Sequence, residues 1–407
     1  MDRALDRGGP ALSERNASQP TTGSQVFLPL VAHGDETQPL EEARALWVTR
    51  WDYSSPEDVA TIVERAATAH FNIIFFQIRG NADAYYDSRF EPWAQRLSGT
   101  LGQDPGWDPL ALAVEEAHQR GLELHAYMNV YPSWVGAEPP SPASPEPMFH
   151  QFNRLYGDTW VQWHEDGTPM GLNPSYLWAS PGHWAVPKHV LCVAQDIVSH
   201  YEVDGLHLDN VRYAGPAYSH DPVSTALFAQ EQILNPGLTW GDWQRARISE
   251  LVEQMHTQAC AVREGLILSA AVWPVYRDHW PWWTTADGYD GYYQDSLGWL
   301  QAGQIDAICP MLYGSTLLLY EDRFESLLRD FVTQAEGQPI YAGINAGYDD
   351  FSPIARRIEL ARAVGAQGQA IFSSRLIEQR GFWEDFRQGP YAQQALVPDR
   401  GNEVQSP

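Results

Sequence analysis

The sequence predicts a (β/α)8 (TIM) barrel of the α/β class, with long loops after the carboxyl ends of several strands. Three observations lead to this fold class. From residue 43 onward, short apolar segments rich in β-branched and aromatic residues alternate with longer segments of helical periodicity. There are eight such apolar segments, and eight parallel strand–helix units close naturally into a barrel. The connections on one face are also much longer than those on the other.

The eight predicted strands are short and separated by helical segments. They cover residues 44–51, 72–80, 122–132, 203–213, 266–274, 305–314, 339–348 and 369–375. The first predicted helix, 55–71, opens with Ser55 and Pro56 followed by acidic residues, a typical helix start. Further helices are predicted at 108–121, 187–201, 243–265, 296–303, 322–337 and 353–368. We expect a flexible N-terminal tail at 1–42, one catalytic domain at 43–397 and a C-terminal tail at 398–407.

A doubly wound parallel sheet is the alternative fold. It requires a glycine-rich phosphate-binding turn after the first strand, and the segment "TRWDYSSPED" at 49–58 has no glycine. The long connections 133–172, 214–242 and 275–295 follow the third, fourth and fifth strands. Within the first of these, "WVQWHEDGTPMGL" predicts a hairpin turn around Asp166 and Gly167. Active sites of barrels lie on the face these loops occupy, so the sequence predicts a cleft for an extended substrate.

Composition excludes several classes of function. The formal net charge of −26 argues against binding to nucleic acid or anionic lipid, and it favours a neutral or cationic substrate. No apolar run approaches the about 20 residues that a membrane span requires. No P-loop and no Ser-centred GxSxG motif is present, so we expect no cofactor.

Polar residues on the predicted strands are candidates for the site. Residues two apart on a strand share a face, so Leu206 and Leu208 face the helices while His207 and Asp209 face the barrel mouth. The same alternation selects further polar residues on the second and third strands, and one more candidate lies at the end of the sixth. These are Gln77, Arg79, His125, Tyr127, Asn129 and Tyr313.

Carboxylates are the second group of candidates. Hydrolysis of a glycosidic bond uses one ionised and one protonated carboxyl group. We expect Asp209 to be the nucleophile or charge stabiliser, with Arg212 nearby; the alternative is a purely structural ion pair with Arg79 or Arg212. Asp295 and Asp83 are the candidate general acids, although Asp295 could instead cap a helix. Their rivals are Asp52, Asp349 and Asp350.

The segment "HWPWWTTADGYDGYYQD", 279–295, concentrates aromatic residues in a loop interrupted by proline and glycine. Flat apolar rings suit the faces of sugars, so Trp282, Trp283 and Tyr293 are candidate substrate contacts. Packing within the protein is the alternative. His125, His207 and Asp209 could also form a zinc site, but neither HxH nor HExxH occurs, and we expect no metal.

Several segments resemble a known family. They are "FQIRGNADAYYDSRFEPWAQRLSGTLGQDPGWDPLALAVEEAHQRGLELHAYMN", "DGLHLDNVRY", "YYQDSLGWLQAGQIDAICPMLY" and "GFWEDFRQGPYAQQALVP". In this order, over residues 44–397, they resemble glycoside-hydrolase-like family 10, formerly domain of unknown function 187. The resemblance implies a (β/α)8 glycosidase, often exported, with one member associated with peptidoglycan strands stripped of peptides. The family's polar motif residues fall on Gln77, Arg79, Asp83, His125, Asn129, His207, Asp209, Asp295 and Tyr313.

The chain departs from the family pattern at two places. Relatives often have two adjacent acids where this chain has Asp209 and Asn210, and an Asn near Arg50-Trp51-Asp52. We therefore expect a glycoside hydrolase that acts on a polysaccharide or oligosaccharide, whose substrate can differ from that of the best-known member. A non-catalytic carbohydrate-binding barrel and a metal-dependent sugar deacetylase are the alternatives. No leader is visible in residues 1–42, but the resemblance implies an extracytoplasmic or secreted protein; a cytoplasmic one is the alternative.

Overall fold

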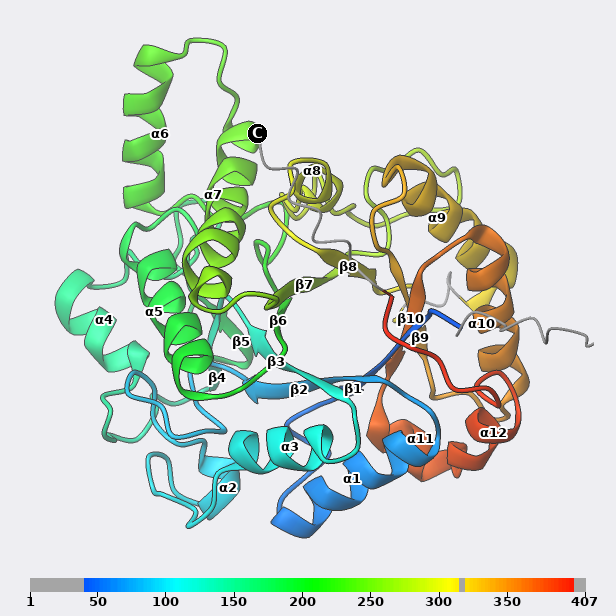
Figure 1. The fold of residues 1–407 in the computed structure, drawn as a ribbon. Coiled ribbons are helices and arrows are strands. Elements are labelled where there is room, and N and C mark those ends of the chain that lie inside the picture. Colours follow the sequence, from blue (N-terminus) through cyan, green and yellow to red (C-terminus); the bar gives the residue numbers. More distant parts are fainter. Residues whose placement is uncertain (1–39, 315–318, 399–407) are drawn as a thin grey trace, which may run out of the picture. The chain divides into compact units, whose positions relative to one another are not determined.

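The computed structural model describes residues 40–314 and 319–398. The tails predicted at 1–42 and 398–407 therefore fall almost entirely outside the described residues. Eight strands form one parallel sheet in the order β8-β7-β6-β3-β2-β1-β10-β9 (Figure 1). They are β1 (Ala43–Val48), β2 (Ile73–Arg79), β3 (Glu123–Asn129), β6 (Gly205–Asp209), β7 (Ile267–Val272), β8 (Ala307–Pro310), β9 (Tyr341–Asn345) and β10 (Gly368–Phe372).

Two parallel bridges between β8 and β9 nearly close the sheet into a barrel. They join Ile308 to Ile340 and Met311 to Gly343. The predicted (β/α)8 barrel is confirmed, and each of the eight barrel strands overlaps one predicted strand. The predicted strands run too far into the loops: the fourth ends at Asp209, so Arg212 lies in the loop after β6.

Helices surround the strands (Figure 1). Those of the barrel are α1 (Pro56–Thr68), α3 (Pro109–His118), α5 (Ala185–His200), α7 (Trp240–Gln254), α8 (Ser296–Gln301), α9 (Glu321–Gln334) and α10 (Ser352–Val364). Additional helices are α2 (Gln95–Ser98), α4 (Met148–Tyr156), α6 (Pro222–Leu234), α11 (Ser374–Arg380) and α12 (Trp383–Gln388). The predicted start of α1 is confirmed, because Ser55 and Asp58 cap each other's backbone N–H groups. Within the described ranges, no helix is both long and apolar enough to cross a membrane.

The core has an outer and an inner layer. Leu206 and Leu208 of β6 are fully buried in the outer layer, which fills the space between the strands and the helices. Trp47, Phe75 and Tyr127 belong to the inner layer, inside the barrel. Alternate side chains of a strand therefore enter different layers, as the period of two predicts.

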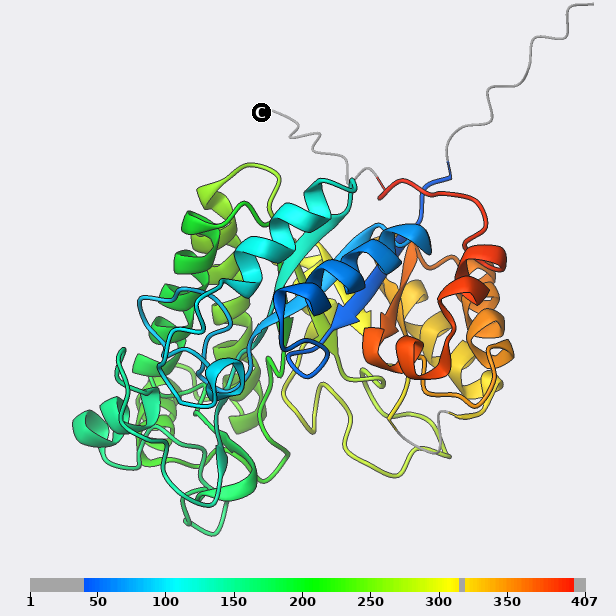
Figure 2. The same cartoon turned by 90° about the horizontal axis from the view of Figure 1, so that it is seen from below.

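The loops after the strands lie on one side of the barrel, and residues 40–42 and 390–398 lie on the opposite side (Figure 2). The loop after β3 contains the predicted turn: His164 and Thr168 are hydrogen-bonded, and Trp163 pairs antiparallel with Pro169. The same loop also forms an antiparallel pair that was not predicted, β4 (Pro132–Gly136) with β5 (Asn173–Trp178).

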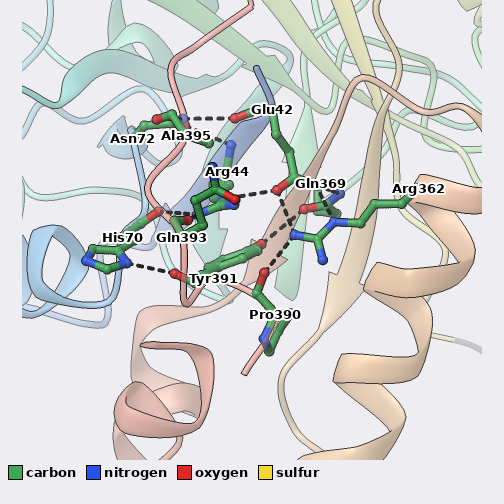
Figure 3. Close-up of polar contacts among 10 residues, drawn as sticks. All are labelled: Glu42, Arg44, His70, Asn72, Arg362, Gln369, Pro390, Tyr391, Gln393 and Ala395. Carbon is green, nitrogen blue, oxygen red and sulfur yellow. Dashed lines mark hydrogen bonds and ion pairs between the residues drawn. The ribbon is translucent and has the colours of Figure 1, made fainter. Parts of the chain in front are cut away.

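An ionic network closes the amino-terminal end of the barrel (Figure 3). Glu42 accepts hydrogen bonds from Arg44 Nε at 2.8 Å and from Arg362 Nε at 2.7 Å. The Arg44 guanidinium lies 4.4 Å from the centre of the Tyr391 ring. Backbone hydrogen bonds join Leu396 to residues 40 and 42, so the C-terminal segment is fastened across the start of β1. In barrels this end serves stability, while chemistry occurs at the opposite end.

Candidate active site

A pocket of about 250 Å³ lies at the carboxyl ends of the barrel strands, and we call it the inner pocket. Its walls combine aromatic rings with amide, hydroxyl and carboxylate groups. They are formed by Trp47, Thr49, Arg50, Trp51, Gln77, Tyr127, Asn129, Tyr176, Asp209, Asn210, Ala271, Met311, Tyr313 and Phe372. Five of the residues selected from the sequence are thereby brought together, namely Gln77, Tyr127, Asn129, Asp209 and Tyr313.

Asp209, the last residue of β6, is held by two hydrogen bonds. The Tyr127 hydroxyl donates to its Oδ2 at 2.8 Å, and the backbone N–H of Asn210 donates to its Oδ1 at 2.6 Å. Burial, with Asp209 as a further cause, raises the pKa of Tyr127 well above its ordinary value, so this phenol keeps its proton. The carboxylate is thus oriented by a permanent donor, and its residue lines the pocket.

Amide side chains organise the wall beside Asp209. Asn129 donates to the carbonyl of Gly80 at 2.8 Å and accepts from Asn210 Nδ2 at 3.1 Å. Gln77 Oε1 accepts from the backbone N–H of Arg50 at 3.0 Å. These bonds fix both amides at the pocket wall, where their remaining polar atoms suit sugar hydroxyls.

The two histidines lie below the pocket, and the expectation that they contact substrate is corrected. His207 is fully buried and stacks on Phe75 with ring centres 3.8 Å apart. Trp47 donates to its Nε2 at 2.9 Å, and its Nδ1 is 2.9 Å from the Ser269 hydroxyl. Burial lowers the His207 pKa well below its ordinary value, so the ring is neutral and positions Trp47. His125 is fully buried one layer deeper, next to Glu123.

Arg79 also does not line the pocket. The register between β2 and β3 shifts after Gln77, so Arg79 is paired with Met128, a residue of the outer layer. Its guanidinium forms two hydrogen bonds to Glu91, at 2.8 and 2.7 Å. The alternation that correctly places Gln77 fails two residues later because this bulge breaks the period of two.

A second pocket, of about 460 Å³, adjoins the first, and we call it the outer pocket. It shares Arg50 and Trp51 with the inner pocket, and we call the two together the groove. Asp83 lines the outer pocket, only 8% exposed, and accepts from the backbone N–H of Asn81 at 2.9 Å. Burial raises the Asp83 pKa, and the opposing effect of the Arg50 charge does not cancel it. The raised pKa favours the protonated form of Asp83.

Asp295 is at the start of α8, outside both pockets. It caps the helix by accepting from Gly298 N at 3.1 Å and also accepts from the Tyr276 hydroxyl at 2.6 Å. The alternative reading of Asp295 as a helix cap is therefore confirmed.

The rival acids have structural partners. Asp52 accepts from Thr49 and Ser374, Asp350 caps Ser352, and Asp349 is 96% exposed and pairs with Arg380.

Comparison with known proteins decides the family. The family Glycosyl hydrolase-like 10 matches residues 42–348, about three quarters of the chain. The chain belongs to the glycosyl hydrolase-like 10 family. Glycosyl hydrolase YngK of Bacillus subtilis is 26% identical, over 92% of this chain and 76% of that protein. Glycosyl hydrolase DigH of Escherichia coli K12 is 24% identical, over 75% of this chain and 68% of that protein.

Solved structures agree on the fold. The PgaB (BpsB) glycoside hydrolase domain of Bordetella bronchiseptica superposes with a TM-score of 0.62 at 13% identity, covering 88% of this chain and 100% of that one. The catalytic domain of β-amylase from Paenibacillus polymyxa has a TM-score of 0.57 at 10% identity, covering 85% and 98%. Membership of the glycosyl hydrolase-like 10 family supports a glycosidase role, and these neighbours show the barrel fold.

In this glycosyl hydrolase-like 10 protein, the rings of the aromatic loop after β7 pack mainly against other parts of the protein. Trp283 and Tyr293 are buried in the outer layer, at 6% and 8% exposure, and the Tyr293 hydroxyl donates to the carbonyl of Pro216. Trp282 packs between Trp280 and Arg323, outside both pockets. The expectation that these three residues line the substrate site is corrected. Their rings pack against other residues of the protein instead.

Arg212 contributes to the site from behind its wall. Its guanidinium lies about 5 Å from the ring centres of Trp178, Trp273 and Tyr292. It donates to Asn210 Oδ1 at 3.0 Å. Arg212 thus supports Asn210 and places a positive charge near Asp209 without lining either pocket.

Four aromatic residues of the inner pocket were not predicted from the sequence, namely Trp47, Trp51, Tyr176 and Phe372. Trp47 and Phe372 are on the first and last barrel strands, so strand alternation could have found them. Tyr176 could not be found this way, because it is on β5 at the end of a long excursion. Among the described residues, no three His, Cys, Asp or Glu side chains are grouped so that they could hold a metal ion.

Proposed function

We propose that this chain hydrolyses glycosidic bonds in a polysaccharide, with Asp209 as the nucleophile or charge-stabilising carboxylate. One observation carries the proposal: Asp209 lines the inner pocket, oriented by Tyr127, among rings and amides that suit a sugar. As the bond to the leaving sugar breaks, positive charge develops on the remaining ring, and a carboxylate beside it lowers the barrier. Gln77, Asn129 and Tyr313 would bind sugar hydroxyls.

Asp83 is our first candidate for the general acid. A general acid must hold a proton at working pH, and burial raises the Asp83 pKa in that direction. Asp83 lines the outer pocket, which shares Arg50 and Trp51 with the inner one. It would protonate the leaving oxygen as the bond breaks. Asp295 is the second candidate, although it lines neither pocket.

The relatives guide the choice of substrate. Both curated relatives are named glycosyl hydrolases, and we propose a cell-wall or extracellular glycan, with peptide-stripped peptidoglycan strands as the first test substrate. A location outside the cytoplasm stays a prediction.

The test is release of reducing ends from a panel of polysaccharides that includes peptide-stripped peptidoglycan. Wild type is compared with Asp209→Asn, Asp83→Asn and Asp295→Asn, and with Asp349→Asn as a matched control on an exposed acid. We expect Asp209→Asn and Asp83→Asn to lower kcat by roughly 10²- to 10⁴-fold. If Asp295→Asn loses the release of reducing ends and Asp83→Asn retains it, the role of general acid passes to Asp295.

A carbohydrate-binding protein without turnover is the second candidate. The observation that favours it is that Asp209 is the one carboxylate among the described residues lining the inner pocket. This candidate predicts that no glycan in the panel releases reducing ends, while Asp209→Asn still binds a glycan that the wild type binds.

A further inference from the structure

Arg50 is a buried cation that makes no ion pair with an Asp or Glu of the described residues. Its residue is only 4% exposed, and its guanidinium donates to the Tyr176 hydroxyl at 3.1 Å. Within the part of the chain that the structure describes, no Asp or Glu oxygen lies within ion-pair distance of it. Arg44 and Arg79, both fully buried, each have such a partner. Buried charges are normally paired, so an unpaired one in a pocket wall indicates a site for an anion.

The surroundings hold the Arg50 side chain in the groove. Arg50 lines both pockets, on the border where they meet. Gly80 lies directly against it: a Cβ at Gly80 would fall 2.7 Å from Arg50 Cδ and 2.8 Å from its Nε and Cζ. Neither Nε nor Nη1 of Arg50 has a hydrogen-bond acceptor among the described residues. The absence of a side chain at Gly80 thus leaves room for a guanidinium whose remaining donors are available to a ligand.

The charge around Asp209 differs from that of the whole chain. The net charge of −26 argues for a neutral or cationic substrate. Around Asp209, however, the buried Arg50 and the partly buried Arg212 have no ion-pair partner in the described ranges. Long-range repulsion is screened beyond about 8 Å at physiological ionic strength, so the local groups decide what binds.

We propose that the groove binds an acidic sugar unit, whose carboxylate is held by the Arg50 guanidinium. The inference rests on the proposed function of the same groove and names its substrate class. A planar guanidinium matches a carboxylate with two parallel hydrogen bonds. Trp51, 51% exposed and 4.9 Å from the Arg50 guanidinium, offers a ring face for the same sugar.

The experiment compares each acidic probe with its own carboxyl-reduced, neutral form. Binding of oligogalacturonate, alginate and hyaluronan fragments is measured by calorimetry with the full chain, in the Asp209→Asn background wherever the wild type cleaves them. We expect at least one acidic probe to bind about tenfold more tightly than its reduced form, a preference that weakens with salt. Arg50→Gln should remove the preference and Gly80→Ala should reduce it, because a Cβ displaces the guanidinium. Arg375→Gln, a matched change at an exposed arginine outside the groove, should keep it.

The outcomes separate this inference from the proposed function. If every acidic probe binds as tightly as its reduced form, or if the preference for the acidic form persists in Arg50→Gln, the inference is overturned. Cleavage of any glycan in the panel would still uphold the proposed hydrolase. An Arg50-dependent preference for an acidic probe without cleavage of any glycan would uphold the inference and remove the hydrolase. Failure of all three acidic probes to bind would also overturn the inference.

Discussion

The Tyr127 hydroxyl donates a 2.8 Å hydrogen bond to Asp209 Oδ2 across the adjacent strands β3 and β6. Strand pairing places Asn129 opposite Asp209 and Tyr127 opposite His207. His207 in turn accepts from Trp47 on β1. Side chains from three strands therefore determine where one carboxylate points, and the strength of this support can be measured.

Tyr127→Phe removes the donor to Asp209 without removing the ring. We expect kcat to fall roughly 10- to 100-fold with KM little changed, since a hydrogen bond to a charged group is lost. Steady-state kinetics with the best glycan of the panel would measure it. Tyr201→Phe is the matched control, because Tyr201 makes a similar 2.6 Å bond to Asp108 outside the groove. Equal effects of the two variants would show that Tyr127 acts on stability alone.

The pH dependence of activity reports on Asp83. Burial raises the Asp83 pKa, so its acid form persists to higher pH than that of an ordinary aspartate. If Asp83 is the general acid, kcat falls as the pH rises through this raised value, and Asp83→Asn lacks that alkaline limb. An alkaline limb that persists in Asp83→Asn would point to another group.

Stability gives an independent test of the same residue. Because the folded-state pKa of Asp83 is raised, the folded form binds the proton more tightly, and stability is lost as the pH rises from about 4 through the folded value. Asp83→Asn should therefore be more stable than wild type at pH 7 and similar to it near pH 3. Urea unfolding at both pH values would measure the difference. A variant less stable than wild type at pH 7 would contradict it.

Arg79 should affect stability rather than substrate binding. Burial opposes ionisation of Glu91, but the Arg79 charge and the His189 hydrogen bond outweigh it and hold the Glu91 pKa at about 2. Arg79→Met leaves this buried carboxylate without its main partner, so we expect a loss of about 3–5 kcal/mol in unfolding free energy. KM of the folded fraction should stay unchanged. Arg329→Met, which breaks an exposed pair with Glu325, should cost less than about 1 kcal/mol.

The ionic network around Glu42, at the amino-terminal end of the barrel, makes the free energy of unfolding depend on pH. Burial acts to raise the Glu42 pKa, but hydrogen bonds from Arg362, Gln369 and Arg44 outweigh it and keep it below the ordinary value. This stabilisation is present above about pH 4.3 and is lost as the pH falls through the folded-state pKa. Glu42→Gln should cost about 3 kcal/mol at pH 7 and progressively less below pH 4. Glu325→Gln, in the exposed pair with Arg329, should change little at either pH.

Much of the fold could be predicted because it depends on local patterns. Ser55 and Pro56 predicted the start of α1, and the alternating Leu206 and Leu208 predicted the outer face of β6. The same alternation directs His207 into the barrel, but it does not say how deep. Depth depends on how Trp47 and Phe75 fill the interior above and beside the ring, which involves strands far apart in the sequence.

The sequence by itself determined the barrel, the face that carries the long loops, and the position of Asp209 at the end of a strand. Only the tertiary structure decided which polar residues meet. A bulge in β2 directs Arg79 outward to Glu91, and Asp295 caps the start of α8. Tyr176, which follows the long connection after β3, contacts Arg50. Periodicity is a property of neighbouring residues, and each short strand or helix expresses it alone. A pocket is made by side chains from several strands and loops, whose contacts arise only when the distant segments pack together.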